Sequence, residues 1–598
     1  TVSLRIEDYA MIGDTHTVAL VGNDGSIDWL CLPRFDSPSV FTRLLGTAEH
    51  GHWQLSPRGG VRRVARRYRP DTLILETDLE TPDGEVRLID LMPVRGGRAD
   101  VLRIVEGRRG RVPMRMDLVL RFDYGSIVPW VERTDGRLLA FGGPDAMLLE
   151  TPLPTRGEHL TTVSEFVVSE GDRVPFRLTW FASHEQPPAG GLDCEADLAA
   201  TEQFWTDWSS GSRLGAEWRD EAMRSLITLK ALTYAPTGGS VAAPTTSLPE
   251  HLGGVRNWDY RYCWLRDATF VLSAFINSGH RAEAEAWRGW LIRAVGGDPD
   301  HLQIMYGIGG ERRLPEHELP WLPGYGGSRP VRIGNGAAPQ LQLDAAGMVF
   351  DALHLAHTKG LAEPGDAAWA VKTGMLDLLE RRWVEPDSGL WEVRAERRHY
   401  THSKVMSWVA FDRAVKTIER YGMRGPLDRW RALRRQIHDE VCERSWNDRV
   451  GAFTMSYGSD LLDASLLTMP LVGFLPVDDP RVQATIRAIE QQLAFGDFLL
   501  RYETPDAEVD GLPPGEGAFL LCTAWLANCY AMAGRLDRAR DLTRRLVGIS
   551  NDVGLLAEQY DPVEGRMLGN FPQAFSHLGL VSAINAINGW GPPSEPEE

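Results

Sequence analysis

Two patterns of hydrophobic residues divide this chain near residue 195. In residues 1–194, short apolar runs are separated by Gly, Asn, Asp and Pro, the residues that favour tight turns. Many short strands joined by tight turns predict an N-terminal antiparallel β-sandwich over residues 1–194. Hairpin turns are expected at Gly22–Gly25, Pro82–Gly84, Asp135-Gly136 and Glu170-Gly171.

Beyond residue 195 the apolar positions recur with helical spacing. Residues 195–215 predict a linker helix, and residues 216–598 contain six apolar stretches that alternate with six amphipathic ones. From the second onward, the apolar stretches begin about every 57 residues, which indicates a repeat. Because the polar caps of an open solenoid are missing from the sequence, we predict that residues 216–598 form a closed (α/α)6 barrel. The apolar helices are expected at 263–280, 344–360, 403–422, 460–476, 516–534 and 572–588, and the amphipathic ones at 216–236, 281–297, 366–383, 425–447, 481–496 and 536–550.

Composition and charge restrict the kinds of partner. The net charge of −18 argues against nucleic acid, and no apolar run reaches the length of a membrane span. The N-terminus does not have the pattern of a signal peptide, and the six cysteines are scattered without zinc-ligand spacing. We therefore expect a reduced, cytoplasmic protein without a metal site, for which a homo-oligomer is compatible with the sequence.

Clusters of polar residues stand just ahead of five of the six predicted apolar helices. In a closed ring of helices that alternate in direction, the N-terminal ends of the inner helices lie at one mouth of the ring. Polar residues from distant parts of the chain are therefore expected to meet there, which predicts a functional site. The clusters are 256–267, 329–344, 389–404, 501–516 and the segment that ends at Glu558.

Two carboxylates in these clusters have neighbours that suit acid–base chemistry. Glu392 follows Trp391, and an indole beside a partly buried carboxyl favours the protonated form that a general acid needs. Glu558 precedes Gln559 and Tyr560, which can orient a water for a general base. Such a pair is what glycoside hydrolysis requires. Spacing alone also permits both residues to be helix N-terminal charges that stabilise the helix dipole.

Two further features fit a sugar site without requiring one. Arg266 and Asp267 are adjacent and can clamp neighbouring hydroxyls of one pyranose, although a structural ion pair explains them equally well. The 20 tryptophans offer flat rings for the apolar faces of sugars, but core packing is the simpler explanation of their number.

Taken together, these motifs resemble glycoside hydrolase family 15, the family of glucoamylases, glucodextranases and trehalases. The resemblance covers nearly the whole chain, and residues 6–14 and 24–31 resemble the β-sandwich domain of its bacterial members. The matching motifs are Trp258–Asp267, Gly389–Glu392, Arg501-Tyr502, Leu556–Tyr560 and Asn570–His577.

This resemblance implies a role for each matching position. Glu392 corresponds to the family's general acid and Glu558 to its general base. The family acts by inversion and releases β-glucose from a non-reducing α-glucosyl end, and its chemistry uses no metal or redox cofactor. The positions expected to bind the sugar are Trp258, Arg266, Asp267, Trp391, Arg501, Tyr502, Tyr560 and His577.

The sequence departs from its relatives around the leaving-group side. Val393 and Arg394 follow the acid, where fungal glucoamylases have a second Glu. Ala346-Gly347-Met348 stands where many relatives carry Tyr-Gly-Glu. A small α-glucoside is the expected substrate, with trehalose favoured and isomalto- or malto-oligosaccharides open; dependence on phosphate or magnesium is implied only by the likeness to actinobacterial trehalases. The alternatives are an inverting disaccharide phosphorylase and a non-catalytic sugar-binding protein.

Overall fold

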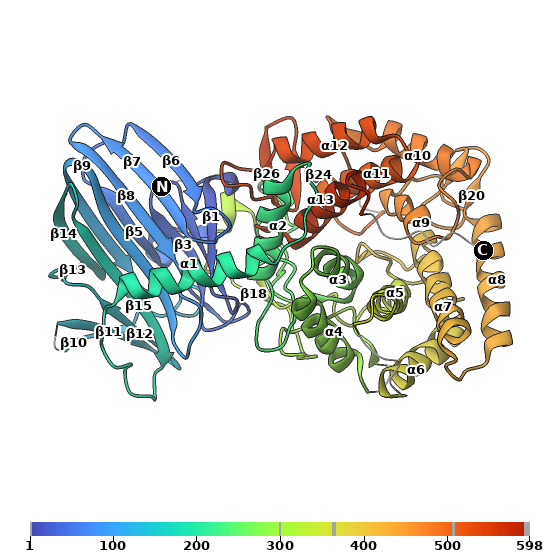
Figure 1. The fold of residues 1–598 in the computed structure, drawn as a ribbon, viewed down its shortest axis with the longest axis horizontal. Coiled ribbons are helices and arrows are strands. Elements are labelled where there is room, and N and C mark those ends of the chain that lie inside the picture. Colours follow the sequence, from blue (N-terminus) through green and yellow to red (C-terminus); the bar gives the residue numbers. More distant parts are fainter. Residues whose placement is uncertain (1–2, 135, 298–300, 362–365, 505–508, 591–598) are drawn as a thin grey trace.

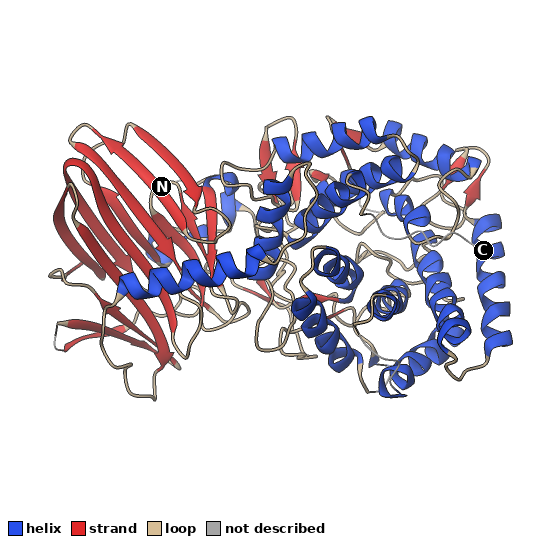
Figure 2. Ribbon diagram, viewed as in Figure 1, coloured by secondary structure: helices blue, strands red, loops and turns tan. Residues whose placement is uncertain are grey.

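The computed structural model describes residues 3–134, 136–297, 301–361, 366–504 and 509–590. The N-terminal region consists of strands and the C-terminal region of helices, and the two lie side by side (Figures 1 and 2). Helix α1 (Cys194–Ser210) runs along the strands and leads into the helical region.

One long strand, β9 (Ala99–Val119), organises the N-terminal region. Its first half pairs with β8 and β15, and its second half pairs with β5 and β14, all antiparallel. It therefore joins two groups of strands into one continuous network. The strands of this network are β1 Tyr9–Gly13, β2 Val18–Gly22, β3 Ser26–Cys31, β4 Ser39–Phe41, β5 His52–Pro57, β6 Arg63–Tyr68, β7 Leu75–Thr81, β8 Gly84–Leu91, β9, β10 Trp130–Thr134, β11 Arg137–Gly142, β12 Asp145–Glu150, β13 Arg156–Glu158, β14 Thr161–Ser169 and β15 Arg173–Ala182.

Three of the four predicted hairpins are confirmed: β2 pairs with β3, β7 with β8, and β10 with β11. The fourth is wrong, because β14 and β15 pair with the two halves of β9 rather than with each other. Their connecting turn packs on Gly107, whose amide donates to the carbonyl of Asp172 at 2.9 Å. A Cβ at Gly107 would lie 1.9 Å from the Ser169 carbonyl oxygen, so only glycine permits this approach.

In the helical region, buried and half-exposed helices alternate as predicted. Helix α3 contacts α5, α5 contacts α7, α11 contacts α13, and α13 contacts α3, while α4, α8 and α12 pack against this set. The helices are α2 Arg219–Ala231, α3 Ala268–Asn277, α4 Arg281–Val295, α5 Asp344–Thr358, α6 Asp366–Arg382, α7 Thr401–Tyr421, α8 Leu427–Arg444, α9 Thr468–Leu471, α10 Pro480–Gln492, α11 Leu520–Met532, α12 Leu536–Gly548 and α13 Ala574–Ile587. The short strands between them are β16 to β23, each two residues long, and a three-stranded sheet of β24 Ala518–Phe519, β25 Gln559–Asp561 and β26 Arg566–Leu568.

The predicted helix over 460–476 is wrong in its length. It is replaced by a 3₁₀ turn at Ala464–Leu467 and the four-residue helix α9. Gly473 follows α9 with a φ of 75°, the left-handed conformation that ends helices. The apolar composition of this stretch reflects burial of irregular backbone as well as of helix.

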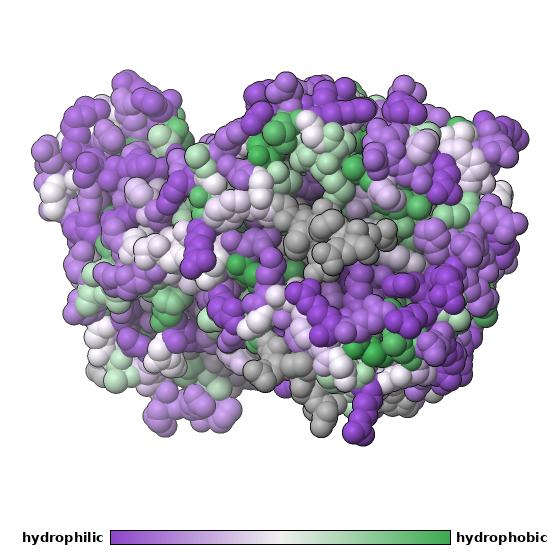
Figure 3. All heavy atoms as spheres, turned by 45° about the vertical axis from the view of Figure 1, so that its right-hand side comes forward, coloured by the Kyte–Doolittle hydropathy of each residue, from purple (hydrophilic) through white to green (hydrophobic). Residues whose placement is uncertain are grey.

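Contacts between distant parts of the chain join the two regions. The indole of Trp29 donates to the carbonyl of Pro244 at 2.9 Å, and Arg34 forms an ion pair with Glu311 at 2.8 Å. Figure 3 shows a face of the molecule that is mostly hydrophilic, with hydrophobic residues in small separate patches. Among the described helices, none is long and apolar enough to cross a membrane.

Candidate active site

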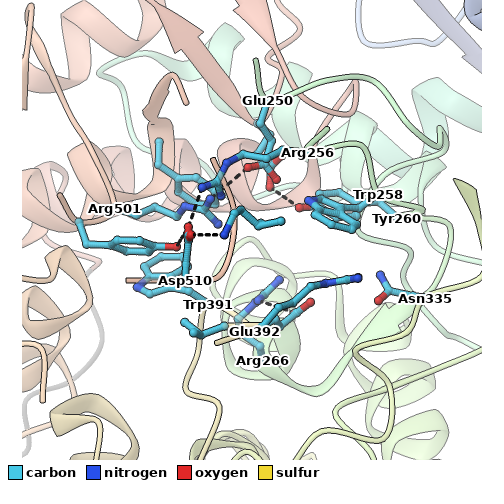
Figure 4. A pocket seen from close by; sticks show the side chains of 16 residues that line it. Glu250, Arg256, Trp258, Tyr260, Arg266, Asn335, Trp391, Glu392, Arg501 and Asp510 are labelled. Atoms are coloured by element: carbon cyan, nitrogen blue, oxygen red, sulfur yellow. Dashed lines mark hydrogen bonds and ion pairs between the residues drawn. The ribbon is translucent and has the colours of Figure 1, made fainter. Parts of the chain in front are cut away.

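The polar clusters ahead of α3, α5, α7, α11 and α13 meet around one cavity (Figure 4). This convergence is what the alternation of helices predicts. Glu392 and Arg266 lie on one side of the cavity, and Glu250 and Arg256 lie on the other. The residues singled out from the sequence that line it are Trp258, Arg266, Trp391, Glu392, Arg501, Tyr502 and Glu558.

Glu392 lies in the loop between α6 and α7 and has a φ of 59°. One of its oxygens, Oε1, accepts hydrogen bonds from Trp264 Nε1 at 2.6 Å and from Arg266 Nη1 at 3.1 Å. The indole that contacts this carboxyl is therefore that of Trp264. Trp391, which the sequence suggested for that contact, instead donates from Nε1 to Asp463 at 2.9 Å.

Glu558 lies directly before β25, in a segment tied to the start of α13. Ser576 Oγ donates to the Ala557 carbonyl at 2.7 Å, and the Leu556 amide donates to His577 Nε2 at 3.2 Å. Oε1 of Glu558 accepts a hydrogen bond from the Tyr260 hydroxyl at 2.8 Å. Within the described residues, Oε2 of Glu558 is buried without a hydrogen-bond partner.

The surroundings of Glu558 favour its protonated form. Burial is the main cause, followed by the negative charge of Glu250, and together they raise the pKa of Glu558 to about 8. The guanidinium of Arg501 and the hydrogen bond from Tyr260 act in the opposite direction. This carboxyl thus lies close to the balance between its two protonation states near neutral pH.

Beside Glu558, two arginines and three acidic residues form a buried ionic network. Arg501 pairs with Glu250 at 3.1 Å and also with Glu516. Arg256 Nη2 donates to Asp510 at 2.7 Å, and the hydroxyl of Tyr502 donates to the same Asp510 oxygen at 3.1 Å. Because each guanidinium is fixed by carboxylates, its remaining donors have fixed directions. Such an arrangement can bind several hydroxyls of one sugar.

At the rim of the cavity, Trp258 lies under two guanidinium groups. The Cζ atom of Arg394 is 4.1 Å from the centre of the Trp258 ring, and that of Arg332 is 4.5 Å away. Glu316 pairs with both, at 3.0 Å to Arg394 and 3.7 Å to Arg332. Arg394, one of the departures noted in the sequence, thus belongs to a charged rim at the cavity.

Three residues expected to bind the sugar lie outside the cavity lining. Asp267 is buried beside Arg266, where burial raises its pKa to about 7. Tyr560 lies on β25 and packs against Phe498, with ring centres 5.6 Å apart. Both ring nitrogens of His577 are engaged, with Ser225 and with the Leu556 amide, so its role is to hold the Glu558 segment.

The structure also adds residues to the site that the sequence did not single out. Tyr260 and Arg256 stand within the recognised cluster 256–267, so closer attention to that motif could have found them. Asp510 likewise lies within the recognised cluster 501–516, whereas Glu250 has no local signal, because its role comes from a contact with Arg501, which is far away in the chain.

Comparison with known proteins places the chain in a family. Residues 217–585 match the family model for glycosyl hydrolases family 15, and residues 1–156 match the trehalase-like N-terminal domain. The chain is 39% identical to a trehalase of Mycolicibacterium smegmatis, over 97% of this chain and 90% of that protein. It is 33% identical to a trehalase of Thermoplasma volcanium, over 96% of this chain and 92% of that protein.

The fold is similar to that of a bacterial glucoamylase whose crystal structure was determined in complex with acarbose. The TM-score is 0.75 at 11% identity, and the match covers 98% of this chain and 94% of the other. At that identity the likeness concerns the fold alone, but the match of the family model does not depend on it. The chain therefore belongs to glycosyl hydrolases family 15 and is a glycoside hydrolase.

Proposed function

We propose that this protein is an inverting, exo-acting trehalase that hydrolyses α,α-trehalose to one molecule each of β- and α-glucose. The observation that carries this proposal is that two of the glutamates lining the cavity, Glu392 and Glu558, each accept a hydrogen bond from the segment Trp258–Asp267. The trehalases that are 33–39% identical to this chain over nearly their full lengths support the choice of substrate.

In the proposed reaction, Glu392 donates its proton to the glycosidic oxygen as the bond from that oxygen to C1 breaks. Glu558 accepts a proton from a water, whose oxygen forms the new bond to C1 on the opposite face of the ring. The free oxygen of Glu558, Oε2, is the acceptor for this water. Arg501, Arg256 and their carboxylate partners bind the hydroxyls of the glucosyl unit that is attacked.

Inversion requires room for the water between the acid and the base. We expect the carboxyl groups of Glu392 and Glu558 to lie about 6.5–9.5 Å apart in a substrate complex. A separation of about 5 Å would imply a retaining mechanism with a covalent intermediate and would contradict the proposal.

We also propose the fold of each domain and the domain boundaries along the chain. The N-terminal domain is a β-sandwich over residues 1–194, residues 195–215 form the linker, and residues 216–598 form an (α/α)6 barrel. The contacts that run from α3 through α5 to α7, across the 3₁₀ turn Ala464–Leu467 to α11, and through α13 back to α3 support the barrel. Limited proteolysis is expected to cut first within or near the linker.

A substrate panel tests the proposed function. Trehalose, kojibiose, nigerose, maltose, isomaltose and starch are incubated with the protein, and the anomer first released is identified by proton NMR. We expect the highest kcat/KM for trehalose and β-glucose as the newly formed product. Preference for another linkage, or release of α-glucose alone, would contradict the proposal.

The same assay separates hydrolysis from phosphorolysis. Family 15 glycosidases generally need no cofactor for the chemistry, and no step of the proposed reaction involves phosphate or magnesium. Free glucose should therefore form in phosphate-free buffer, and glucose phosphate should not form when phosphate is added. Titration of phosphate and magnesium would then show whether either ion changes the rate.

A further inference from the structure

Arg261 lies in the middle of the segment Trp258–Asp267 but outside the lining of the cavity. Its side chain is only 1% exposed, so a charged group of this size needs a complete set of partners. Those partners come from both regions of the molecule, which is unusual for a residue so close to a candidate active site.

The N-terminal region supplies one side of the Arg261 environment. Nη2 donates to the hydroxyl of Tyr124 at 2.8 Å, and Nη1 donates to the carbonyl of Ser37 at 3.0 Å. The thiol of Cys31 is 3.5 Å from the same Nη1. All three partners lie in or beside the strands of the N-terminal network, far from Arg261 in the sequence.

On the other side, Arg261 forms a two-point ion pair with Asp259. Nε lies 2.9 Å from Oδ1, and Nη2 lies 2.7 Å from Oδ2. Asp259 also accepts from the Gly334 amide at 3.1 Å, and its carbonyl accepts from the side chain of Asn335, a cavity residue, at 3.3 Å. The ion pair therefore holds two loops of the helical region together.

The neighbours of this pair reach both Glu392 and Glu558. Tyr260, between Asp259 and Arg261, donates to Glu558, and Trp264 donates to Glu392. The rings of Tyr260 and Trp264 lie edge to face with their centres 5.4 Å apart, so that one of them can hardly move without the other.

We propose that Arg261 is a positioning residue through which the N-terminal domain sets the geometry of both Glu392 and Glu558. This inference rests on the proposed function, because it assumes that these two glutamates are the acid and the base. The N-terminal domain is then a working part of the active site, although none of its residues lines the described cavity.

Two variants test this inference in the full-length protein. Arg261→Lys removes the fork that joins Tyr124 and Asp259, and Tyr124→Phe removes one hydrogen bond and leaves the buried charge paired. We expect kcat for trehalose to fall roughly 10- to 100-fold in Arg261→Lys, because small misplacements of catalytic groups have effects of this size. Tyr124→Phe should show a smaller fall. KM should change little in both, since neither residue lines the cavity.

The pH dependence of kcat/KM distinguishes a role in positioning Glu558 from a general role in stability. The titratable and charged groups that act on Glu558 are Glu250, Arg501, Tyr260 and Arg266. Of these, Tyr260 and Arg266 both lie in the segment Trp258–Asp267, and the charge of Arg266 and the hydrogen bond from Tyr260 both lower the pKa of Glu558. When that bond is misaligned, the acid limb of the kcat/KM profile should move to higher pH, in the same direction as in Tyr260→Phe.

Arg103→Lys is a matched control. Arg103 is also fully buried and paired with an aspartate, Asp90 at 2.7 Å, but its other partners, the carbonyls of Trp53 and Gly25, all lie within the N-terminal region. This variant should lower Tm and leave kcat and the acid limb unchanged.

The outcomes separate the two proposals. A wild-type protein without activity on trehalose would refute the proposed function. An active wild type whose Arg261→Lys and Tyr124→Phe variants keep both kcat and the acid limb would refute the inference alone, as would an Arg103→Lys variant with the same kinetic changes.

Discussion

Glu392 and Glu558 face the same cavity, but their surroundings differ in the number of donors and in the charges nearby. Two donors, an indole and a guanidinium, fix one oxygen of Glu392, whose side chain is 18% exposed. A single hydroxyl holds Glu558, which is buried beside the acidic Glu250. One carboxyl is thus controlled mainly by geometry and the other mainly by its electrostatic environment.

This difference fits the two proposed tasks. A general acid must hold its proton at one point in space, next to the glycosidic oxygen, so rigid orientation is what it needs. A general base needs a free oxygen and a pKa near the working pH, so that it can accept the proton from water. Burial and the neighbouring Glu250 bring the pKa of Glu558 into that range.

The largest expected effect comes from removing either carboxyl. Glu392→Gln and Glu558→Gln should each lower kcat for trehalose roughly 10²- to 10⁴-fold, the usual contribution of one acid or base. Initial rates of glucose release at one pH measure it. Glu318→Gln changes an exposed carboxyl on β18 (His317–Glu318) and serves as the control. If either active-site variant kept wild-type kcat, the proposed pair would be wrong.

The sequence could point to Glu392 and Glu558 because each stands in a local motif ahead of a helix. The helix positions followed from the period of apolar residues, which is a local property of the chain. The failures had non-local causes. The strands β14 and β15 each pair with β9 instead of pairing with each other. Glu250 is held in the site by a hydrogen bond from Arg501, which lies 251 residues away in the sequence.

The hydrogen-bond partners of the two carboxyls should have effects of intermediate size. Trp264→Phe keeps an aromatic ring but loses the donor to Glu392, and we expect kcat to fall roughly tenfold, in line with one hydrogen bond to a charged group.

Tyr260→Phe should mainly displace the acid limb of kcat/KM to higher pH, because it removes a bond that lowers the pKa of Glu558. Steady-state kinetics over a pH series distinguish the two. Equal pH profiles for both variants would contradict the conclusion that Glu392 is controlled mainly by geometry and Glu558 mainly by its electrostatic environment.

A smaller effect is expected when the charge beside Glu558 is removed. Glu250 raises the pKa of Glu558, and the base must be ionised to act, so Glu250→Gln should move the acid limb of kcat/KM to lower pH. Glu516→Gln is a matched comparison, since it removes the other carboxylate on Arg501, whereas Glu250 is the charged group with the largest effect on the pKa of Glu558. A limb that moves equally in both variants would show that Arg501, rather than Glu250, sets the pKa of the base.

The smallest effect concerns stability. The pKa of Glu558 is about 8 in the folded protein against an ordinary value of 4.5, so the folded state binds the proton more tightly than the unfolded state. Its contribution to stability is therefore fully present below about pH 4.5 and is lost as the pH rises towards 8.

Glutamine at this position carries no charge to bury at any pH. The Tm of Glu558→Gln relative to wild type should thus rise between pH 5 and 8, by on the order of 1–2 °C. A Tm difference for Glu558→Gln that stays constant with pH would mean that the electrostatic environment of the base has been misjudged.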